Sequence, residues 1–371
     1  MKSEGIGTLP QVEGMMRIFR ALLAWLLDLY GGGRGLFTPE REYASSPVRK
    51  VVVLSAGQSP TADIYLRTRL QTSCEGKVQY VDVNLASPRQ LALGEGVLVI
   101  VVRFVPRKWL RALYRKRDVL AGVVYLMDDD IPAAMRATEL PFSYALKTAW
   151  RHATTRRSLA RLCSEIWVST PELARRYATS SPKLYEPAYL PARQAANRNS
   201  SVYFYHGTWA HRREIKWLVP VVSAVQARFP NAWFEIMGTD RVRRLFRGIP
   251  RVRVIHPMSW QDYLAYAGTV RYQVGLAPCL DTDFNRGRSH VKLFDITRLG
   301  AAGIYSNVIP YSDKVLHGTT GWLCENTHDA WVMAIGNLLS DAPLRNALYQ
   351  QARSVCEQTR EKASAEGIFD G

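Results

Sequence analysis

Three consecutive carboxylates, Asp128, Asp129 and Asp130, follow the apolar run of the segment "YLMDDDIP". Such a run predicts a buried strand, and open α/β sheets hold their sites at the carboxyl ends of their strands. Crowded carboxylates repel one another, which raises the pKa of one toward that of a useful base, and their oxygens also suit a divalent cation. A plainer interpretation is an acidic turn that caps a helix starting at Pro132. We predict catalytic roles for all three aspartates.

Cations gather in residues 283–306, "DFNRGRSHVKLFDITRLGAAGIYS", where a polar loop runs into a short helix. A helix N-terminus already carries partial positive charge, so Arg288 and Lys292 beside it indicate a bound anion. Ser289 is a natural N-cap for this helix. Asp295 is a lone carboxylate that can accept two hydrogen bonds at once, as a ribose diol offers. The alternative for Asp295 is an exposed helical acid.

The segment "YHGTWAHRREIKWL" (205–218) also places cations at the start of a helix. The expected strand ends at Gly207, and Thr208 begins a turn. His211 and Arg212 follow, so that backbone N–H groups and cations can face one anion. The sequence contains no glycine-rich dinucleotide fingerprint and no P-loop pattern. A first turn that is merely solvated is the alternative.

Two series of apolar runs must position these groups. The first begins at "KVVVLSAG" (50–57) and continues through "VQYVDV", "GVLVIVVRFV", "AGVVYLM" and "EIWVST". The second begins at "SVYFYHG" (201–207) and continues through "AWFEIMG", "VRVIHP", "YQVGLAP", "AGIYSN" and "GWLCEN". Strands that alternate with helices predict an open, doubly wound sheet, and the restart predicts two. We therefore predict an α/β protein with two Rossmann-like domains that face a ligand-binding cleft.

The 371 residues divide into four predicted parts. An N-terminal extension with an amphipathic helix covers 1–46, and the two sheet domains cover 47–190 and 200–345. A C-terminal helix and tail covers 346–371. Residues 181–200 carry three prolines and a polar end, which predicts a linker. The five cysteines are scattered and form no C-x-x-C pair, which favours free thiols in a reducing compartment and argues against a zinc site.

The segment "GMMRIFRALLAWLLDLYGGG" (14–33) gives about fifteen mostly apolar residues, interrupted by charges, which is fewer than the ~20 that span a bilayer. On a helix, Arg17, Arg20, Ala24 and Asp28 fall on one narrow face, and large apolar residues surround the rest. This pattern predicts a helix in a membrane interface, with its polar stripe toward water. A helix packed on the protein's own body is the alternative.

The formal net charge of +17 is uneven. Residues 1–200 hold 29 Lys and Arg against 17 Asp and Glu, a net charge of +12, and residues 201–371 carry +5. Such a balance indicates an anionic partner, either a membrane surface or nucleic acid, and a solvated surface rich in arginine is the alternative. The stretch "RFVPRKWLRALYRKR" (103–117) mixes seven cations with Trp109 and Tyr114. The helical spacing of its apolar residues suits a core equally well.

Residues 274–353 resemble the nucleotide-binding domain of retaining glycosyltransferases with the GT-B fold, of the group-1 or family-4 type. The resemblance rests on "VGLAPCLDTDFNRGRSHVKLFDITRLGAAGIYSNVIPYSDKVLHGTTGWLCEN". It extends upstream through "HGTWAHRREIKWLVPVV" and "FEIMG", and the order of these motifs is specific. For residues 50–190 only the rhythm of strands and helices is similar.

In that family two glutamates eight residues apart hold the donor: the first contacts the sugar and the second contacts the ribose. The second falls on Asp295 here, whereas the first falls on Gly287, so its side chain is missing. Asn285, Asp283 or backbone amides of the loop can take its place. The family's diphosphate-binding cations have counterparts in both loops: His211 or Arg212, and Arg288 or Lys292.

The resemblance implies retaining transfer of a sugar from a nucleotide-sugar donor to a glycan or lipid-linked acceptor, as in the synthesis of cell-surface polysaccharide or lipopolysaccharide. The donor is then a co-substrate, with no cofactor and no metal, because fixed cations can stabilise the leaving diphosphate. The N-terminal domain binds the acceptor, beside Asp128–Asp130. The residues predicted to bind the donor are Gly207, Thr208, His211, Arg212, Asn285, Arg288, Ser289, Lys292 and Asp295. We expect a cytoplasmic enzyme, peripheral on the inner face of the cell membrane, with no nucleic-acid partner.

Three other interpretations stay open on sequence alone. "YLMDDDIP" is similar to the metal-binding motif of GT-A glycosyltransferases, which predicts a metal-dependent enzyme with a single sheet domain. The charge of +17 fits a nucleic-acid-binding protein, whose affinity falls steeply with salt. The missing carboxylate at Gly287 fits an inactive, nucleotide-binding relative.

Overall fold

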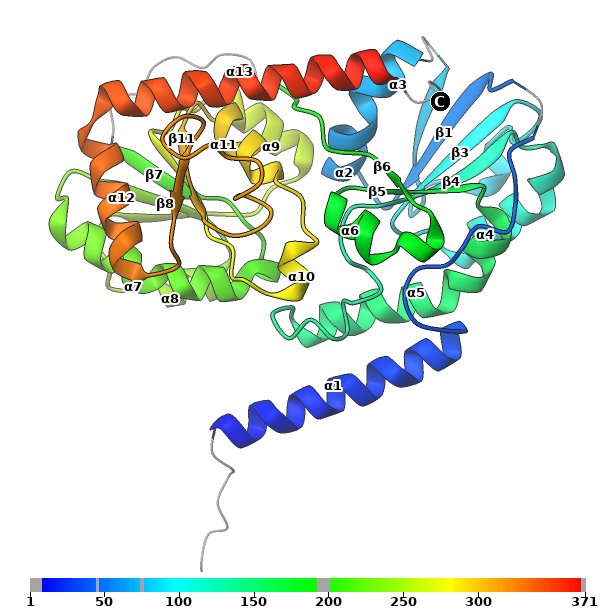
Figure 1. The fold of residues 1–371 in the computed structure, drawn as a ribbon, viewed down its shortest axis with the longest axis horizontal. Coiled ribbons are helices and arrows are strands. Elements are labelled where there is room, and N and C mark those ends of the chain that lie inside the picture. The colour runs from blue at the N-terminus through cyan, green and yellow to red at the C-terminus, as the bar shows by residue number, and fades with distance from the viewer. Residues whose placement is uncertain (1–8, 45–46, 74–76, 192–200, 368–371) are drawn as a thin grey trace, which may run out of the picture.

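The computed structural model describes residues 9–44, 47–73, 77–191 and 201–367. Two parallel six-stranded sheets lie side by side within them (Figure 1). Each sheet has a buried apolar cluster on both of its faces, because helices cover both. The prediction of two doubly wound α/β domains is confirmed.

The N-terminal sheet has the strand order β2-β1-β3-β4-β5-β6, and all neighbouring pairs are parallel. Its strands are β1 (Lys50–Ser55), β2 (Val78–Asp82), β3 (Val97–Val102), β4 (Gly122–Met127), β5 (Glu165–Val168) and β6 (Lys183–Leu184). The helices of this half are α1 (Leu9–Gly31), α2 (Pro60–Ala62), α3 (Thr68–Ser73), α4 (Arg107–Lys116), α5 (Phe142–Leu162) and α6 (Pro171–Arg176). A π-helical segment, η1 (Asp63–Arg67), joins α2 to α3.

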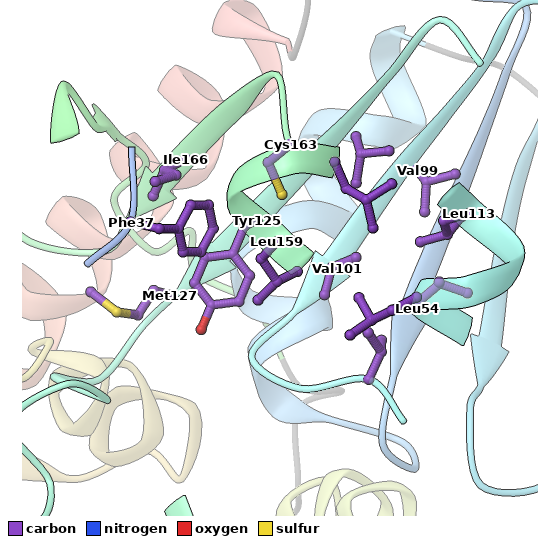
Figure 2. Packing of buried hydrophobic residues seen from close by; sticks show 14 of the residues in the cluster. Phe37, Leu54, Val99, Val101, Leu113, Tyr125, Met127, Leu159, Cys163 and Ile166 are labelled. Carbon is purple, nitrogen blue, oxygen red and sulfur yellow. The ribbon is translucent and has the colours of Figure 1, made fainter. Parts of the chain in front are cut away.

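Apolar sequence explains the central strands of this sheet. β3 and β4 are buried along their whole length, as parallel strands covered on both faces must be. Val99 and Val101 of β3 and Tyr125 of β4 share one core cluster with Leu113 of α4 and Leu159 of α5 (Figure 2). The opposite face packs on α2, η1 and α3. Polar groups are therefore left to the segments that follow the strands.

The C-terminal sheet has the parallel strand order β12-β11-β10-β7-β8-β9. Its strands are β7 (Val202–Tyr205), β8 (Trp233–Met237), β9 (Val252–Ile255), β10 (Val274–Ala277), β11 (Ala302–Ser306) and β12 (Trp322–Cys324). Its helices are α7 (Arg212–Arg228), α8 (Asp240–Leu245), α9 (Trp260–Ala267), α10 (Asp283–Arg286), α11 (Val291–Arg298), α12 (His328–Ser340) and α13 (Ala342–Glu366).

The connections between the domains differ from the predicted layout in two places. The strand β6 forms inside the segment predicted as a linker, of which 192–200 lies outside the described residues. The last helix, α13, starts at Ala342, before the predicted boundary at 346, and contacts α3 of the N-terminal half (Figure 1). The chain thus crosses between the sheets twice, and its last helix ties both domains together.

A helix does form over 9–31, but α1 turns its faces the opposite way from the prediction. It lies along α5, outside the N-terminal sheet (Figure 1). Arg20 is 4% exposed and donates to the backbone oxygens of Ala137 and Leu140, at 2.6 and 2.9 Å. Ile18, on the apolar face, is 72% exposed. The predicted water-facing polar stripe is therefore wrong: Arg20, Ala24 and Asp28 face the protein, and Arg20 adds a hydrogen bond to each of two backbone oxygens before α5.

The basic stretch 103–117 contributes its apolar side chains to the core. Trp109 and Leu113 have no exposed surface, and the Trp109 indole N–H donates to the oxygen of Val83 at 3.1 Å. Tyr114 is half exposed. The tryptophan is thus not available to stack on a nucleic-acid base, so this stretch gives little support to a nucleic-acid surface.

Candidate active site in the interdomain cleft

A cavity of about 310 Å³ lies between the two domains. Residues that follow β3 and β4 line one wall, and residues that follow β7 and β10 line the other. Seven of the residues predicted for the site line it: Asp128, Asp129, Thr208, His211, Arg288, Ser289 and Lys292. The other five lie outside its lining: Asp130, Gly207, Arg212, Asn285 and Asp295. Carboxylates of one domain therefore face cations of the other across the cavity.

Asp128 is engaged by groups of its own domain. Arg103, directly after β3, donates to both of its carboxylate oxygens, and the Nη2–Oδ2 distance is 2.6 Å. Thr61 donates to the same Oδ2 at 2.7 Å. Arg103 also adopts a left-handed backbone (φ 58°), which is rare for residues with a side chain. Asp128 therefore positions Arg103 at the cavity wall.

Asp130 is a structural carboxylate. Its side chain has no exposed surface. It accepts hydrogen bonds from Arg176 and from the Tyr177 hydroxyl, and one from the backbone N–H of Ala133 at 3.2 Å. Arg176 also donates to the backbone oxygen of Asp283 at 2.9 Å, so this cluster reaches across to the C-terminal domain.

We expect Asp130→Ala to lower the free energy of unfolding by about 3 kcal/mol, because the partly buried Arg176 and the buried Tyr177 lose their shared acceptor. The measurement is urea unfolding followed by circular dichroism. Asp283→Ala is the matched control, since that side chain is 95% exposed, and we expect it to change stability by less than about 0.5 kcal/mol. Equal effects of the two substitutions would contradict the structural role of Asp130.

Asp129 is the more exposed of the two aspartates that line the cavity. Its side chain is 31% exposed, and Arg103 Nη2 donates to it at 3.1 Å. Its position in the cleft raises its pKa through loss of solvation; Arg103 opposes this effect, and the neighbouring Asp128 carboxylate adds to it. A carboxylate with a raised pKa and an open approach suits proton transfer. The sequence could not separate the three aspartates, because only their contacts differ.

Arg288 and His211 form a pair on the opposite wall. Arg288 Nη1 donates to His211 Nδ1 at 2.9 Å, so that ring nitrogen carries no proton. Burial, aided by the charges of Arg288 and Lys292, holds the pKa of His211 well below its usual value. His211 is therefore a neutral ring with its proton on Nε2, and not the cation that the sequence suggested.

Lys292 supplies the second positive charge at this wall. Its Nζ donates to the backbone oxygen of His206 and lies 3.7 Å from Asp295. Burial lowers the pKa of Lys292, and the attraction of Asp295 opposes this shift. The helix α11 starts at Val291 with His290 at the N-cap position and without a side-chain cap. The predicted N-cap, Ser289, is thus one residue too early, and the first N–H groups of α11 keep no side-chain acceptor.

Asp295 and Asn285 are engaged within the C-terminal domain. Arg298 Nη1 donates to Asp295 at 2.7 Å, and the Asp295 side chain is 16% exposed. Asn285 is fully buried, and its Nδ2 donates to the oxygen of Leu280 at 2.8 Å and to Glu214 at 3.2 Å. These bonds shape the loop and the helix around the cavity.

Gly287 lies where the two domains touch. Its backbone oxygen accepts a hydrogen bond from the Thr170 hydroxyl at 3.2 Å. A Cβ atom at Gly287 would lie 3.2 Å from Leu173 Cδ2, tighter than most contacts of this kind. The close approach of the N-terminal domain explains a glycine here, although the sequence comparison with the family expects a glutamate. Of the two side chains suggested in its place, Asn285 is buried and Asp283 is 95% exposed.

The two remaining predicted residues have packing roles. Arg212 Nη2 donates across the cleft to the backbone oxygen of Leu140 at 2.9 Å. A Cβ atom at Gly207 would lie 2.7 Å from the Tyr205 hydroxyl, so a side chain there would displace a ring that lines the cavity.

Arg103, Tyr65 and Tyr144 also line the cavity, and none of them was predicted as a site residue. One signal was available for Arg103, a charged residue directly after a wholly apolar strand. Nothing comparable marks the tyrosines, because they lie within helical segments between strands: Tyr65 on η1, after β1, and Tyr144 on α5, after β4.

The GT-A alternative can be tested directly on the architecture. The GT-A alternative predicted a single sheet domain, and the two sheets contradict it. Among the described residues, no group of three or more His, Cys, Asp or Glu side chains is placed to hold a metal ion. None of the helices in the described part of the chain is long and apolar enough to cross a membrane.

Comparison with known proteins identifies the fold. No protein-family model and no curated protein matches the chain. Sucrose-phosphate synthase from Thermosynechococcus elongatus matches 86% of this chain and 97% of its own, with 13% identity and a TM-score of 0.57. HepE from Anabaena, solved with UDP and glucose, matches 86% and 98%, with 10% identity and a TM-score of 0.54. TarM from S. aureus matches 75% of this chain, with 12% identity and a TM-score of 0.52, and the match spans 56% of TarM. That structure is a mutant solved with fondaparinux, α-GlcNAc-glycerol and UDP. These likenesses establish the GT-B fold.

Proposed function

We propose that the protein is a glycosyltransferase that moves a sugar from a nucleotide-sugar donor to a glycan or lipid-linked acceptor. The observation that carries the proposal is the cavity, with Arg288 and Lys292 on the C-terminal wall and Asp129 on the N-terminal wall. A leaving diphosphate needs fixed positive charge, and an attacking hydroxyl needs a proton acceptor. The C-terminal wall supplies the positive charge, and the N-terminal wall supplies the proton acceptor.

The donor diphosphate is proposed to lie between Arg288, Lys292 and the start of α11. The two side chains and the uncapped N–H groups of that helix all attract an anion. Neutral His211 can add a hydrogen bond from Nε2. HepE, which shares the fold, was solved with UDP and glucose and with UDP-glucose, which supports a nucleotide sugar as the ligand class.

In the proposed reaction the bond from the sugar anomeric carbon to the diphosphate oxygen breaks, and a bond to the acceptor oxygen forms. The electron pair leaves with the diphosphate, whose charge Arg288 and Lys292 stabilise. Asp129 takes the proton of the acceptor hydroxyl. Retention of configuration and independence from metal and cofactor are part of the proposal, which follows the resemblance to retaining enzymes.

Asp295 is proposed to accept hydrogen bonds from the donor ribose. We expect Asp295→Ala to weaken nucleoside-diphosphate binding by about 1–3 kcal/mol, the loss of a charge-assisted acceptor. Calorimetric titration with UDP, GDP and ADP identifies the nucleotide, and its 2′-deoxy analogue then probes the contact. The wild type should bind the 2′-deoxy analogue more weakly than the ribonucleotide. The variant should bind the two nucleotides with nearly the same affinity. Equal losses in the two proteins would place the ribose elsewhere.

The enzyme is proposed to work in the cytoplasm, as a peripheral protein on the inner face of the cell membrane, in the synthesis of cell-surface polysaccharide or lipopolysaccharide. The net charge of +12 over residues 1–200 supports an anionic membrane as partner. Nucleic acid is not proposed as a partner, because Trp109 of the basic stretch is buried in the core.

A further inference from the structure

The outer face of α1 is a continuous apolar surface. Its side chains share high exposure: Met15 71%, Ile18 72%, Leu22 54%, Trp25 50%, Leu26 48% and Leu29 64%. Their spacing of three and four residues puts them on one side of the helix. An exposed apolar patch of this kind is unusual on a soluble surface and marks a site where something else binds.

The inner face of α1 is fixed to the protein: Ala24 and Leu27 are buried in an apolar cluster with α5, and polar side chains flank them. Arg20 is held by the two backbone oxygens before α5, and Asp28 pairs with Arg136 and Arg34. Gly31 lies against Ala153 of α5, where a Cβ atom would come within 3.2 Å of the backbone. The helix therefore cannot turn its apolar side inward without breaking a buried arginine's bonds. The apolar face is a built feature of the fold.

Aromatic rings extend the apolar face onto α5. Phe19 lies 6.0 Å from Phe142, and Tyr30 stacks on Trp150 at 5.7 Å. Trp150 is itself 51% exposed. Tryptophan and tyrosine are enriched where a protein meets the interface of a bilayer, because their rings are apolar and their tips are polar.

Positive charge surrounds this surface. Arg17 on α1 is exposed, Arg34 is 74% exposed, and Arg157 lies against Gly32 at the end of the helix. Among the described residues of α1 whose side chains are placed, the acidic one is Asp28, and two arginines neutralise it. A second copy of the same surface would bring like charges together, whereas anionic lipid headgroups would neutralise them.

We propose that α1 lies in the headgroup region of an anionic bilayer, with its exposed apolar face in the acyl boundary and its opposite face, which carries Arg20 and Asp28, on the protein. In an isolated interfacial helix the polar face meets water. In α1 the corresponding face meets the protein instead. The occupant is anionic phospholipid, which matches both the apolar face and the basic rim.

The same helix adjoins the acceptor wall of the cleft. Arg20 of α1 holds Leu140, and Leu140 and Tyr144 line the cavity. A bilayer beneath α1 would therefore lie beside the N-terminal wall, where the proposed acceptor enters. This step rests on the proposed function and narrows the acceptor to a lipid-linked one.

The test is co-sedimentation of full-length protein with phosphatidylglycerol–phosphatidylcholine vesicles at ~0.15 M salt, where the Debye length is ~8 Å. The variant Ile18→Gln, Leu22→Gln, Leu29→Gln keeps every recorded bond of α1 and removes apolar surface. We expect its partition coefficient to fall at least tenfold, and binding of the wild type to fall on pure phosphatidylcholine.

The matched control is Leu85→Gln, Leu316→Gln, Met333→Gln, which changes three similarly exposed apolar residues elsewhere: 87%, 65% and 63%. We expect it to bind vesicles as the wild type does. Failure of the wild type to sediment, or equal loss in both variants, would overturn the proposal. A wild-type dimer in sedimentation equilibrium without lipid that the α1 variant abolishes would assign the face to a second copy instead. The affinity for nucleoside diphosphate, measured in parallel, should be the same in the wild type and both variants. If none of the three proteins binds nucleoside diphosphate, that result would count against the proposed function and not against membrane binding.

Discussion

Asp129→Asn is expected to lower the rate of sugar transfer by about 10²–10⁴-fold, the usual contribution of a positioned general base. Asparagine keeps the size of the side chain and an oxygen that can accept from Arg103, so melting temperature should change little. Wild-type turnover should fall as pH drops through the raised pKa of Asp129, because the base works only when it is unprotonated. The variant should lose this acid limb. The measurement is release of the nucleoside diphosphate from donor in the presence of acceptor, across a pH series.

Asp283→Asn is the control for this substitution. Asp283 is a carboxylate of the cleft region whose side chain is 95% exposed, and we expect full activity from the variant. If Asp129→Asn transfers sugar as fast as the wild type, or is slower but keeps the same pH profile, Asp129 is not the group that takes the proton. The leaving diphosphate itself would then be the next acceptor to consider.

Arg288→Ala is expected to reduce turnover by about 10²–10³-fold, because a fixed cation that meets the charge of the leaving group is lost. Binding of the free nucleoside diphosphate should weaken as well, by about 1.5–3 kcal/mol for one charged hydrogen bond. The substitution also frees His211 Nδ1 from its donor. The pKa of His211 should therefore rise toward its ordinary value, and NMR titration of that ring can follow the change.

Arg286→Ala is the matched control on the same loop. Arg286 is two residues away, 46% exposed and paired with Asp281 at 2.8 Å, outside the cavity lining. We expect its removal to leave nucleotide affinity within about twofold of the wild type, as for a surface substitution. If Arg286→Ala and Arg288→Ala weaken binding equally, the loss comes from the lower positive charge of the surface and not from a specific diphosphate-binding site.

Much of the fold was predictable because it depends on local sequence. The runs at 97–102 and 122–127 contain almost only β-branched and large apolar residues, so they had to be buried parallel strands. The restart of that rhythm at Val202 predicted the second sheet. The two-residue strand β6 could not be predicted, because a strand so short has no periodicity and forms by pairing with β5.

The sequence by itself determined where polar groups collect: three aspartates after one strand, and cations around the start of α11. Only the tertiary structure gives the three aspartates different contacts and therefore different roles. Asp128, Asp129 and Asp130 are chemically identical and adjacent, and they differ only because Arg103, the cavity and Arg176 reach them from distant elements.

The orientation of α1 illustrates the same division. Spacing determined that its polar and apolar residues lie on opposite faces. It could not determine which face meets the protein, because that choice depends on two backbone oxygens, of Ala137 and Leu140, more than 100 residues away. Periodicity is a property of neighbouring residues, whereas the partner of a face is decided by long-range packing and by the need to satisfy buried polar groups.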